Sequence, residues 1–337
     1  MLVSWNTTNS CNLACRHCYR DAGEASKQEL TTEEALRLID GIVAAGFKIM
    51  IFSGGEPLMR PDILYLIEYA ARQGLRPVLG SNGTLIDGSM AQKLKKAGLA
   101  VAGISLDSIH RQEHDEFRAV QGCWQAALDG MAACREAGLP FQVHTTVMDW
   151  NYRQVLAVTD LAVQAGARGH HIFFLVPTGR GVNIAAASLQ AQHYEDLLRD
   201  ILQKQATVPI ELKPTCAPQF MRLARQMNVP VRFSRGCLAG ISYCIINPVG
   251  DVQPCAYMEV VAGNVRREEF SRLWAESPVF LRLRSMQYSG GCGLCQYRKV
   301  CGGCRARALY YHGDYMAEEP WCLYRESLSG RELAKNE

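Results

Sequence analysis

Short apolar runs rich in β-branched residues alternate with longer amphipathic stretches through the first two thirds of the chain. The short runs predict β-strands, and stretches with apolar residues every three or four positions predict α-helices. We expect strands at residues 2–7, 48–53, 76–80, 101–106, 141–147 and 170–176. We expect helices at residues 32–45, 62–73, 89–97, 124–137, 152–165 and 191–205. This alternation predicts an α/β fold built from six βα units.

Several expected helices end at a glycine, as at Gly46 and Gly74, and glycine tolerates the left-handed conformation that follows a helix. From around residue 207 the periodicity fades, and prolines and cysteines crowd together. The expected organisation is an α/β unit, a bridging segment, a small metal-organised domain and a tail, at residues 1–206, 207–236, 237–325 and 326–337.

Composition narrows the class of protein. The chain has 337 residues, 48% of them hydrophobic, which is enough for a barrel and a small second domain. A net charge of +3 is too small to indicate a nucleic-acid partner. No apolar run approaches the roughly 18 residues of a membrane span, and no basic segment marks a signal peptide. The 14 cysteines, many at CxxC-type spacings, indicate metal clusters and a reducing cytoplasm.

Cys11, Cys15 and Cys18 form a C-x3-C-x2-C motif directly after the first expected strand. Thiolates favour iron–sulfur clusters and zinc, and sites with four ligands are the norm. A cubane cluster on three thiolates keeps one iron open to a substrate, which is the arrangement needed to bind S-adenosylmethionine (SAM). In this motif the chain resembles the radical SAM superfamily. A zinc knuckle is the alternative that the cysteines alone allow.

The resemblance implies a partial (β/α)6 TIM-like barrel with its active site at the C-terminal ends of the strands. Alternation alone would equally allow a doubly wound sheet, and the cysteine motif decides for the barrel. The run Gly54-Gly55-Glu56-Pro57 matches the motif that holds the methionine amino group of SAM. The other implied SAM contacts are Ser81, Asn82, Ser105, Asp107 and, against the adenine, His17. Without the resemblance, all of these residues would be read as parts of ordinary loops and strand-end turns.

A second group of cysteines, which includes a G-x4-C element and a C-x2-C-x5-C-x2-C run, resembles the SPASM domain with its auxiliary clusters. The resemblance assigns one 4Fe–4S cluster to Cys237, Cys244, Cys255 and Cys304, and a second to Cys292, Cys295, Cys301 and Cys322. The chain departs from the SPASM pattern by having two residues before Cys304, where three are usual. Two zinc sites are the chemical alternative. Full thiolate ligation leaves no open iron, so electron transfer is the expected role.

Three cysteines lie outside both motifs. Cys134 and Cys123 are expected to be small buried residues. Cys216 lies in the proline-rich segment that links the expected domains, from which it could reach the active site.

Two substrate classes compete. SPASM proteins often modify peptides or mature other enzymes, whereas some act on tetrapyrroles. Segments 143–147, 170–181, 213–218 and 235–240 resemble the second group, namely the NirJ-type proteins of haem d1 biosynthesis and the related 12,18-didecarboxysirohaem deacetylase of the alternative haem pathway. Only ten residues precede Cys11 and fifteen follow Cys322, which leaves no room for an added peptide-recognition module.

The residues themselves suit a flat, iron-bearing substrate rich in carboxylates. His144 and His171 lie in late strands, where an iron ligand or proton donor is useful, and Arg180 and Lys213 can pair with propionates. Because side chains alternate along a strand, His170 and His171 point to opposite faces. The plain alternatives are core histidines and a surface arginine.

The implied enzyme cleaves SAM reductively and uses the 5′-deoxyadenosyl radical to remove or modify an acetate or propionate side chain of a sirohaem-derived tetrapyrrole. The implied cofactors are three 4Fe–4S clusters, one of which binds SAM and two of which are auxiliary, together with SAM. An electron donor such as ferredoxin or flavodoxin is implied as a partner.

Overall fold

A computed structural model describes residues 1–324, so the expected tail at residues 326–337 lies outside the described residues. The strands are β1 (Leu2–Asn6), β2 (Ile49–Ser53), β3 (Arg76–Ser81), β4 (Val101–Ser105), β5 (Phe141–Val147), β6 (Gly169–Phe174), β7 (Glu211–Thr215), β8 (Tyr243–Ile246), β9 (Asp251–Gln253) and β10 (Gly263–Asn264). They form one sheet in the order β10-β9-β8-β1-β2-β3-β4-β5-β6-β7. Strands β1 to β7 are parallel, each to the next.

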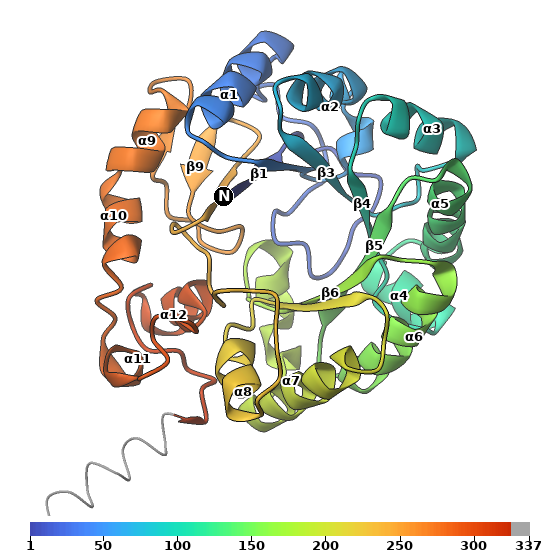
Figure 1. Cartoon of the computed structure of the whole chain (residues 1–337). Coiled ribbons are helices and arrows are strands. Elements are labelled where there is room, and N and C mark those ends of the chain that lie inside the picture. Colours follow the sequence, from blue (N-terminus) through green and yellow to red (C-terminus); the bar gives the residue numbers. More distant parts are fainter. Residues whose placement is uncertain (325–337) are drawn as a thin grey trace, which may run out of the picture.

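The helices surround this sheet, as Figure 1 shows for the barrel viewed from one end. They are α1 (Thr32–Ala44), α2 (Ile63–Arg72), α3 (Gly88–Lys96), α4 (Arg111–Arg118), α5 (Cys123–Ala137), α6 (Val155–Ala165), α7 (Ala191–Gln205), α8 (Phe220–Gln226), α9 (Phe270–Glu276), α10 (Pro278–Ser285), α11 (Gly290–Leu294) and α12 (Arg305–His312). The partial barrel of six βα units that the sequence predicts is confirmed. Across the part of the chain that is described, none of the helices has the length and apolar character to cross a membrane.

The two faces of the curved sheet differ in burial. Along β5, for example, buried and half-buried residues alternate. The buried residues face the helices. His170 on β6 is an example, since it lies within hydrogen-bonding distance of Thr159 on α6. On β5 and β6 the half-buried set therefore lines the inside of the ring, and it includes the polar side chains of Gln142, His144 and His171.

Three barrel elements are absent from the sequence-based prediction. Helix α4 is strongly polar and offers few apolar positions to a periodicity search. Strand β7 lies in the expected bridging segment and contains Pro214, which argues against a central strand. Because β7 is the terminal strand of the described sheet, its proline is tolerated there. Helix α8 follows β7 in the same segment.

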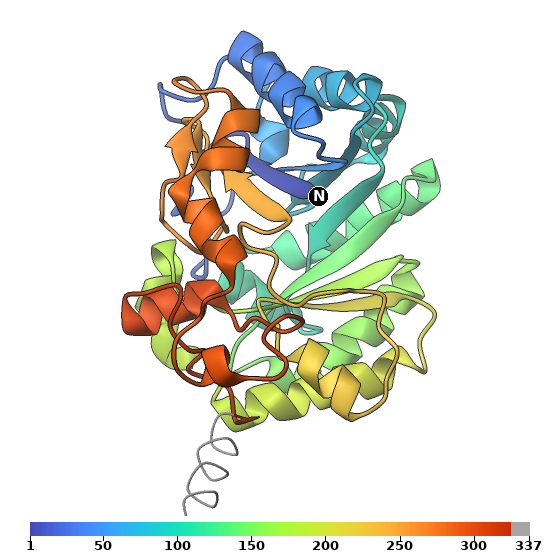
Figure 2. The ribbon, with the colours of Figure 1, turned by 60° about the vertical axis from the view of Figure 1, so that its left-hand side comes forward.

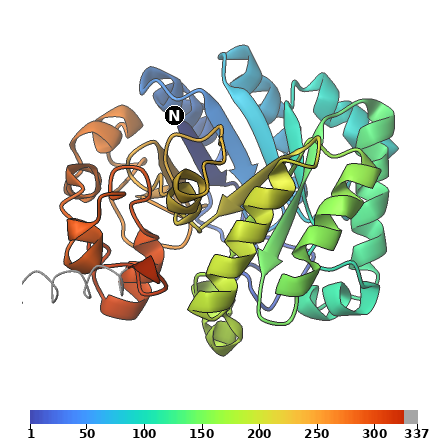
Figure 3. The same cartoon turned by 60° about the horizontal axis from the view of Figure 1, so that its bottom comes forward.

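The C-terminal segment lies beside the barrel and also extends its sheet, as Figures 2 and 3 show in orange and red. Strand β8 pairs in parallel with β1, and β9 and β10 continue the sheet antiparallel. Phe47 packs edge-on against Phe270 and Trp274 of α9, which fastens this segment to the barrel. The N-terminal and C-terminal parts of the chain therefore share one core.

Candidate active site

The three N-terminal cysteines lie on the loop after β1, which crosses the centre of the ring in Figure 1. Leu13 and Cys15 are buried together, and Cys11 and Cys18 pack against them. The Leu13 amide donates to Cys11 Sγ at 3.4 Å, and the Ala22 amide donates to Cys18 Sγ at the same distance. The loop therefore brings the three thiols together and points amide donors at two of the sulfurs.

Arg180, expected to face a propionate, uses its donors on this cysteine loop. Its Nε donates to the Cys15 carbonyl at 2.9 Å, and its backbone amide donates to the Cys18 carbonyl at 2.9 Å. Its Nη1 also pairs with Asp21 at 2.8 Å. The preceding Gly179 has φ 53° and lies so close to the loop that a Cβ would be 2.6 Å from the Cys18 carbonyl oxygen. Residues 179 and 180 thus pack against the cysteine loop and hold its backbone in place.

The Gly54-Gly55-Glu56-Pro57 run follows β2 and lies flat against the stem of the cysteine loop. A Cβ on Gly54 would be 2.5 Å from the Thr8 carbonyl oxygen, and one on Gly55 would be 2.2 Å from that of Ser10. The amides of Gly55 and Glu56 donate to these same two carbonyls at 2.8 Å. Only glycine permits this contact, so the run fixes the loop from the β2 side.

The Glu56 carboxylate links β2 to the end of β3. It is fully buried and accepts hydrogen bonds from the Ser81 hydroxyl at 2.9 Å, the Asn82 amide at 2.8 Å and the Leu58 amide at 3.2 Å. Burial raises the pKa of Glu56 to about 7, although these donors oppose the rise. The Ser105 hydroxyl donates in turn to the Ser81 carbonyl at 3.3 Å. The structure thus connects the expected SAM contacts of β2, β3 and β4.

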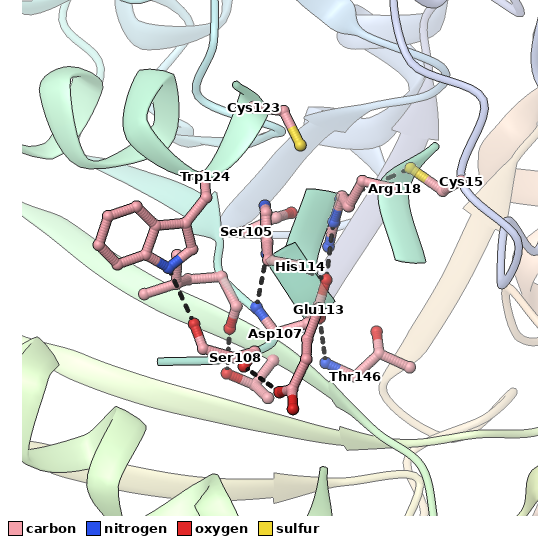
Figure 4. A network of polar contacts seen from close by, with 12 residues as sticks. Cys15, Ser105, Asp107, Ser108, Glu113, His114, Arg118, Cys123, Trp124 and Thr146 are labelled. Atoms are coloured by element: carbon pink, nitrogen blue, oxygen red, sulfur yellow. Dashed lines mark hydrogen bonds and ion pairs between the residues drawn. The ribbon is translucent and has the colours of Figure 1, made fainter. Parts of the chain in front are cut away.

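Asp107 is the centre of a buried polar network that Figure 4 shows. Its carboxylate accepts from Arg118 Nε at 2.7 Å and from the Thr146 amide at 2.8 Å, and its own amide donates to His114 Nδ1 at 3.1 Å. Burial alone would raise the pKa of Asp107, but Arg118 and nearby histidines lower it to about 2. Arg118 Nη1 also lies 3.9 Å from Cys15 Sγ. This network therefore ties α4, β4 and β5 to the cysteine loop.

His17 stacks on Phe117, with ring centroids 4.1 Å apart. Burial lowers the pKa of His17 to about 3, so the ring is neutral at pH 7. Its Nδ1 is buried and has no hydrogen-bond partner among the described residues. A ligand beside the cysteine loop could satisfy this atom.

The late strands place two histidines side by side inside the ring. His144 and His171 occupy the same register on β5 and β6, with parallel rings 5.2 Å apart, and Lys213 follows at that register on β7. Gln142 Nε2 lies 2.8 Å from His144 Nε2, and Glu211 lies 3.8 Å from His171 Nε2. Burial lowers the pKa of His144 well below its usual value, and it also lowers those of His171 and Lys213. Two neutral imidazoles thus face the barrel interior.

A glycine makes room for the first of these rings. A Cβ on Gly103 of β4 would lie 2.3 Å from Cε1 of His144, so the imidazole rests on bare backbone. His170 behaves differently, because its nitrogens bond Thr159 and Thr145 on the helix-facing side. The alternation expected for residues 170 and 171 is therefore confirmed.

The C-terminal cysteines divide into two groups. Cys292, Cys295, Cys301 and Cys322 line one cavity. Cys304 belongs to a small buried cluster against which Cys237 and Cys255 pack, together with Cys216. Cys244 lies instead on β8 within the main barrel core.

Comparison with known proteins identifies the family. Residues 5–183 match the model of the radical SAM superfamily, and residues 237–305 match SPASM, described as an iron-sulfur cluster-binding domain. The chain belongs to the radical SAM superfamily. It is 41% identical to an AdoMet-dependent heme synthase of Methanosarcina barkeri, over 96% of both chains. It is 32% identical to a pre-heme d1 synthase of Dinoroseobacter shibae, over 98% of this chain and 87% of the relative.

Among solved structures, Streptococcus suis SuiB bound to its precursor peptide SuiA is similar with a TM-score of 0.76 and 16% identity, over 96% of this chain and 75% of that one. At this identity the likeness concerns the fold alone. This radical SAM chain is an enzyme that uses reductive SAM cleavage, and its two domains imply iron–sulfur cluster chemistry together with SAM.

The thiols and their surroundings fit the clusters that the radical SAM and SPASM families carry. Burial raises the pKa of Cys11 and that of Cys304 to about 11, and a bound metal would displace the thiol proton. Besides Arg118 at Cys15, Arg305 Nη2 lies 3.6 Å from Cys292 Sγ, and such cations offset the negative charge of a thiolate-bound cluster. Across residues 1–324 no three His, Cys, Asp or Glu side chains are arranged to hold a single metal ion.

Arg118 is the main site residue that the sequence did not predict. Its helix was not expected, and an arginine on such a polar helix reads as a surface charge. Only the strand-end position of Asp107 hinted that a buried cation must lie nearby, because a buried carboxylate needs a partner.

Proposed function

We propose that this radical SAM enzyme acts in tetrapyrrole biosynthesis, where it alters a propionate or acetate side chain of an iron-bearing substrate. The observation that carries the proposal is the 41% identity to the heme synthase, over 96% of both chains. The stacked histidine pair inside the barrel supports it independently, because neutral imidazoles are common iron ligands. Peptide modification remains the alternative, although the likeness to SuiB extends only to the fold.

We assign the SAM-binding cluster to Cys11, Cys15 and Cys18. A cluster held by these cysteines would supply the electron for the reductive cleavage of SAM. The chain's own contribution is to hold the loop rigid: Arg180 binds its carbonyls, and Gly54 and Gly55 pack against its stem.

The SAM site is assigned to Gly54, Gly55, Glu56, Pro57, Ser81, Asn82, Ser105, Asp107 and His17. Within this set Glu56 and Asp107 already accept hydrogen bonds from protein donors. We infer that Asp107 positions neighbouring groups rather than binding SAM directly. The unpartnered Nδ1 of His17 is the atom best placed to meet a bound cofactor.

Two auxiliary 4Fe–4S clusters complete the proposed set of three. The first takes Cys237, Cys255 and Cys304, for which the family pattern adds Cys244, and the second takes Cys292, Cys295, Cys301 and Cys322. The shared cavity of the second set supports its assignment. With thiolates on every iron, we assign these clusters to electron transfer with a ferredoxin or flavodoxin donor.

For the substrate, His144 and His171 are the proposed iron ligand or proton donor, and Lys213 is the proposed propionate partner. Arg180 is reassigned to the cysteine loop, since its guanidinium is engaged there. Haem carries vinyl groups where iron coproporphyrin III carries propionates. Each such conversion loses carbon dioxide, one hydrogen atom and one electron, so an electron acceptor is needed close to the substrate.

The test is anaerobic incubation with SAM, a reductant and either iron coproporphyrin III or didecarboxysirohaem, followed by mass analysis of the porphyrin. Loss of carbon dioxide and two hydrogens per propionate supports haem formation, and loss of acetate groups supports the sirohaem branch. Turnover of a cysteine-containing peptide, with both tetrapyrroles unchanged, would favour the maturase alternative.

Binding provides a second test. Adding the protein should shift the visible absorption of the iron tetrapyrrole, and His144→Ala or His171→Ala should remove the shift. Lys213→Ala should weaken binding by about ten- to a hundred-fold, because a hydrogen bond to a charged group contributes roughly 1.5–3 kcal/mol. Arg153→Ala, which changes a surface residue, is the matched control.

A further inference from the structure

Cys216 follows β7 in the segment Lys213-Pro214-Thr215-Cys216-Ala217-Pro218 and is held in an unusual conformation. Its φ is 59°, in the left-handed region that residues other than glycine rarely adopt. Arg307 Nη2 donates to the Cys216 carbonyl at 2.9 Å and fixes this turn against α12. Because of this left-handed turn, the side chain of Cys216 points in a different direction from the one it would have if β7 continued as extended backbone.

The thiol of Cys216 lies among three expected cluster ligands. It packs against the same small buried cluster as Cys237 and Cys255, and Cys304 is part of that cluster. Cys216, Cys237, Cys255 and Cys304 thus share one small cluster, although they come from three distant parts of the chain, and Cys292 of the second set packs against it as well.

Cys244, the fourth ligand that the family pattern assigns, faces elsewhere. It lies opposite Val3 in the register of β8 and β1, and both residues have no exposed surface. Its neighbour Tyr243 bonds Ser4 on the inner face of the sheet, so alternation turns Cys244 toward the helices.

We propose that Cys216 is the fourth thiolate ligand of the auxiliary cluster at Cys237, Cys255 and Cys304, and that Cys244 is a core residue. Ligation forms an S–Fe bond and releases the thiol proton to solvent, without a change of oxidation state. The proposal rests on the auxiliary clusters of the proposed function and changes which residue completes one of them.

With Cys216 as a ligand, the cluster is joined to β7, the strand that carries the proposed substrate contact Lys213. Lys213 lies three positions before Cys216 on the same short segment and faces the barrel interior beside His171. A cluster bound through Cys216 is therefore anchored directly after β7, the strand that carries Lys213, as well as in the SPASM segment.

The test compares Cys216→Gly with Cys244→Ala in the full chain, after anaerobic purification and reconstitution. Glycine removes the thiol but accepts the positive φ, so this variant should fold. Cys134→Ala, on buried α5, is the matched control. Iron and sulfide are quantified per chain, and EPR spectra are recorded for the reduced protein.

For the wild type we expect about twelve irons per chain, from three cubanes. Cys216→Gly should lose about four of them or show a changed EPR spectrum for one auxiliary cluster, whereas Cys244→Ala and the control should keep the wild-type spectrum. An unchanged cluster in Cys216→Gly, or loss of a cluster in Cys244→Ala, would overturn the proposal. Iron for only one cubane in the wild type would instead refute the auxiliary clusters themselves.

Discussion

At the scale of single residues, the site depends on buried charges that are paired with particular partners. Glu56 differs, because its carboxylate accepts hydrogen bonds from the Ser81 hydroxyl and from two backbone amides rather than from a cationic side chain. Its pKa of about 7 therefore makes the protonation state of the SAM motif sensitive to pH near neutrality.

The first prediction concerns this pH dependence. Since the folded-state pKa of Glu56 is raised from 4.5 to about 7, its stabilising contribution is complete below pH 4.5 and is lost as the pH rises to about 7. The loss is at most about 3 kcal/mol. Thermal midpoints of the anaerobic protein, measured from pH 5 to 8, should fall less in Glu56→Gln than in the wild type. Parallel curves for the two proteins would contradict the burial argument.

The second prediction concerns Arg118. Arg118→Met leaves the carboxylate of Asp107 buried without its cation and should cost about 3–5 kcal/mol in the free energy of unfolding. Arg111→Met, at a side chain that is 62% exposed and 3.6 Å from Asp115, should cost about 0–1 kcal/mol. Chemical denaturation of both variants measures the difference, and equal effects would show that the Asp107 pair contributes no more than a surface pair.

At the scale of elements, the sequence predicted the features that follow from hydrophobic periodicity and from the alternation of side chains along a strand. The range expected for β5 is the observed one, and the two faces at residues 170 and 171 follow from alternation. Helix α4 and strand β7 were missed because their stability comes from packing and edge position rather than from local pattern. The spacing of the cysteines groups Cys244 with Cys237, Cys255 and Cys304, whereas in the structure Cys244 lies in the barrel core and Cys216 packs near the other three. The sequence pattern could not predict the position of Cys216, because its turn depends on contact with α12.

The third prediction uses strand β4. Gly103→Ala should displace the ring of His144, which lies 2.3 Å from the added Cβ, and should abolish the absorption shift of bound iron tetrapyrrole as His144→Ala does. Gly80, opposite Gly103 in the register of β3, provides the control. Its added Cβ meets the Ser53 hydroxyl at 3.3 Å, a side chain that can rotate. A shift retained in Gly103→Ala would remove His144 from the binding site.

At the scale of the whole molecule, the cluster sites are separate in structure, so they should be separable by mutation. The cysteine loop lies in the barrel, whereas the cavity of the second auxiliary set lies in the C-terminal segment.

The fourth prediction follows from this separation. Cys15→Ala should abolish formation of 5′-deoxyadenosine while both auxiliary clusters remain visible by EPR. Cys123→Ala, which removes a buried thiol packed beside the same loop, should keep SAM cleavage and is the control. Product formation is measured by chromatography after anaerobic reduction. Continued SAM cleavage in Cys15→Ala would contradict the assignment of the motif.

The pairing of β8 with β1 has a consequence for biosynthesis. During translation β1 emerges first, yet one of its two neighbours begins only at Tyr243. Until then the strand that leads into the cysteine loop has one edge with unpaired backbone groups, which invites association with other chains. The nascent barrel therefore cannot complete its sheet until the SPASM segment has begun to emerge, and the wall that supports the first cysteine motif is finished late. Folding of this enzyme is thus tied to the order in which its two ends leave the ribosome.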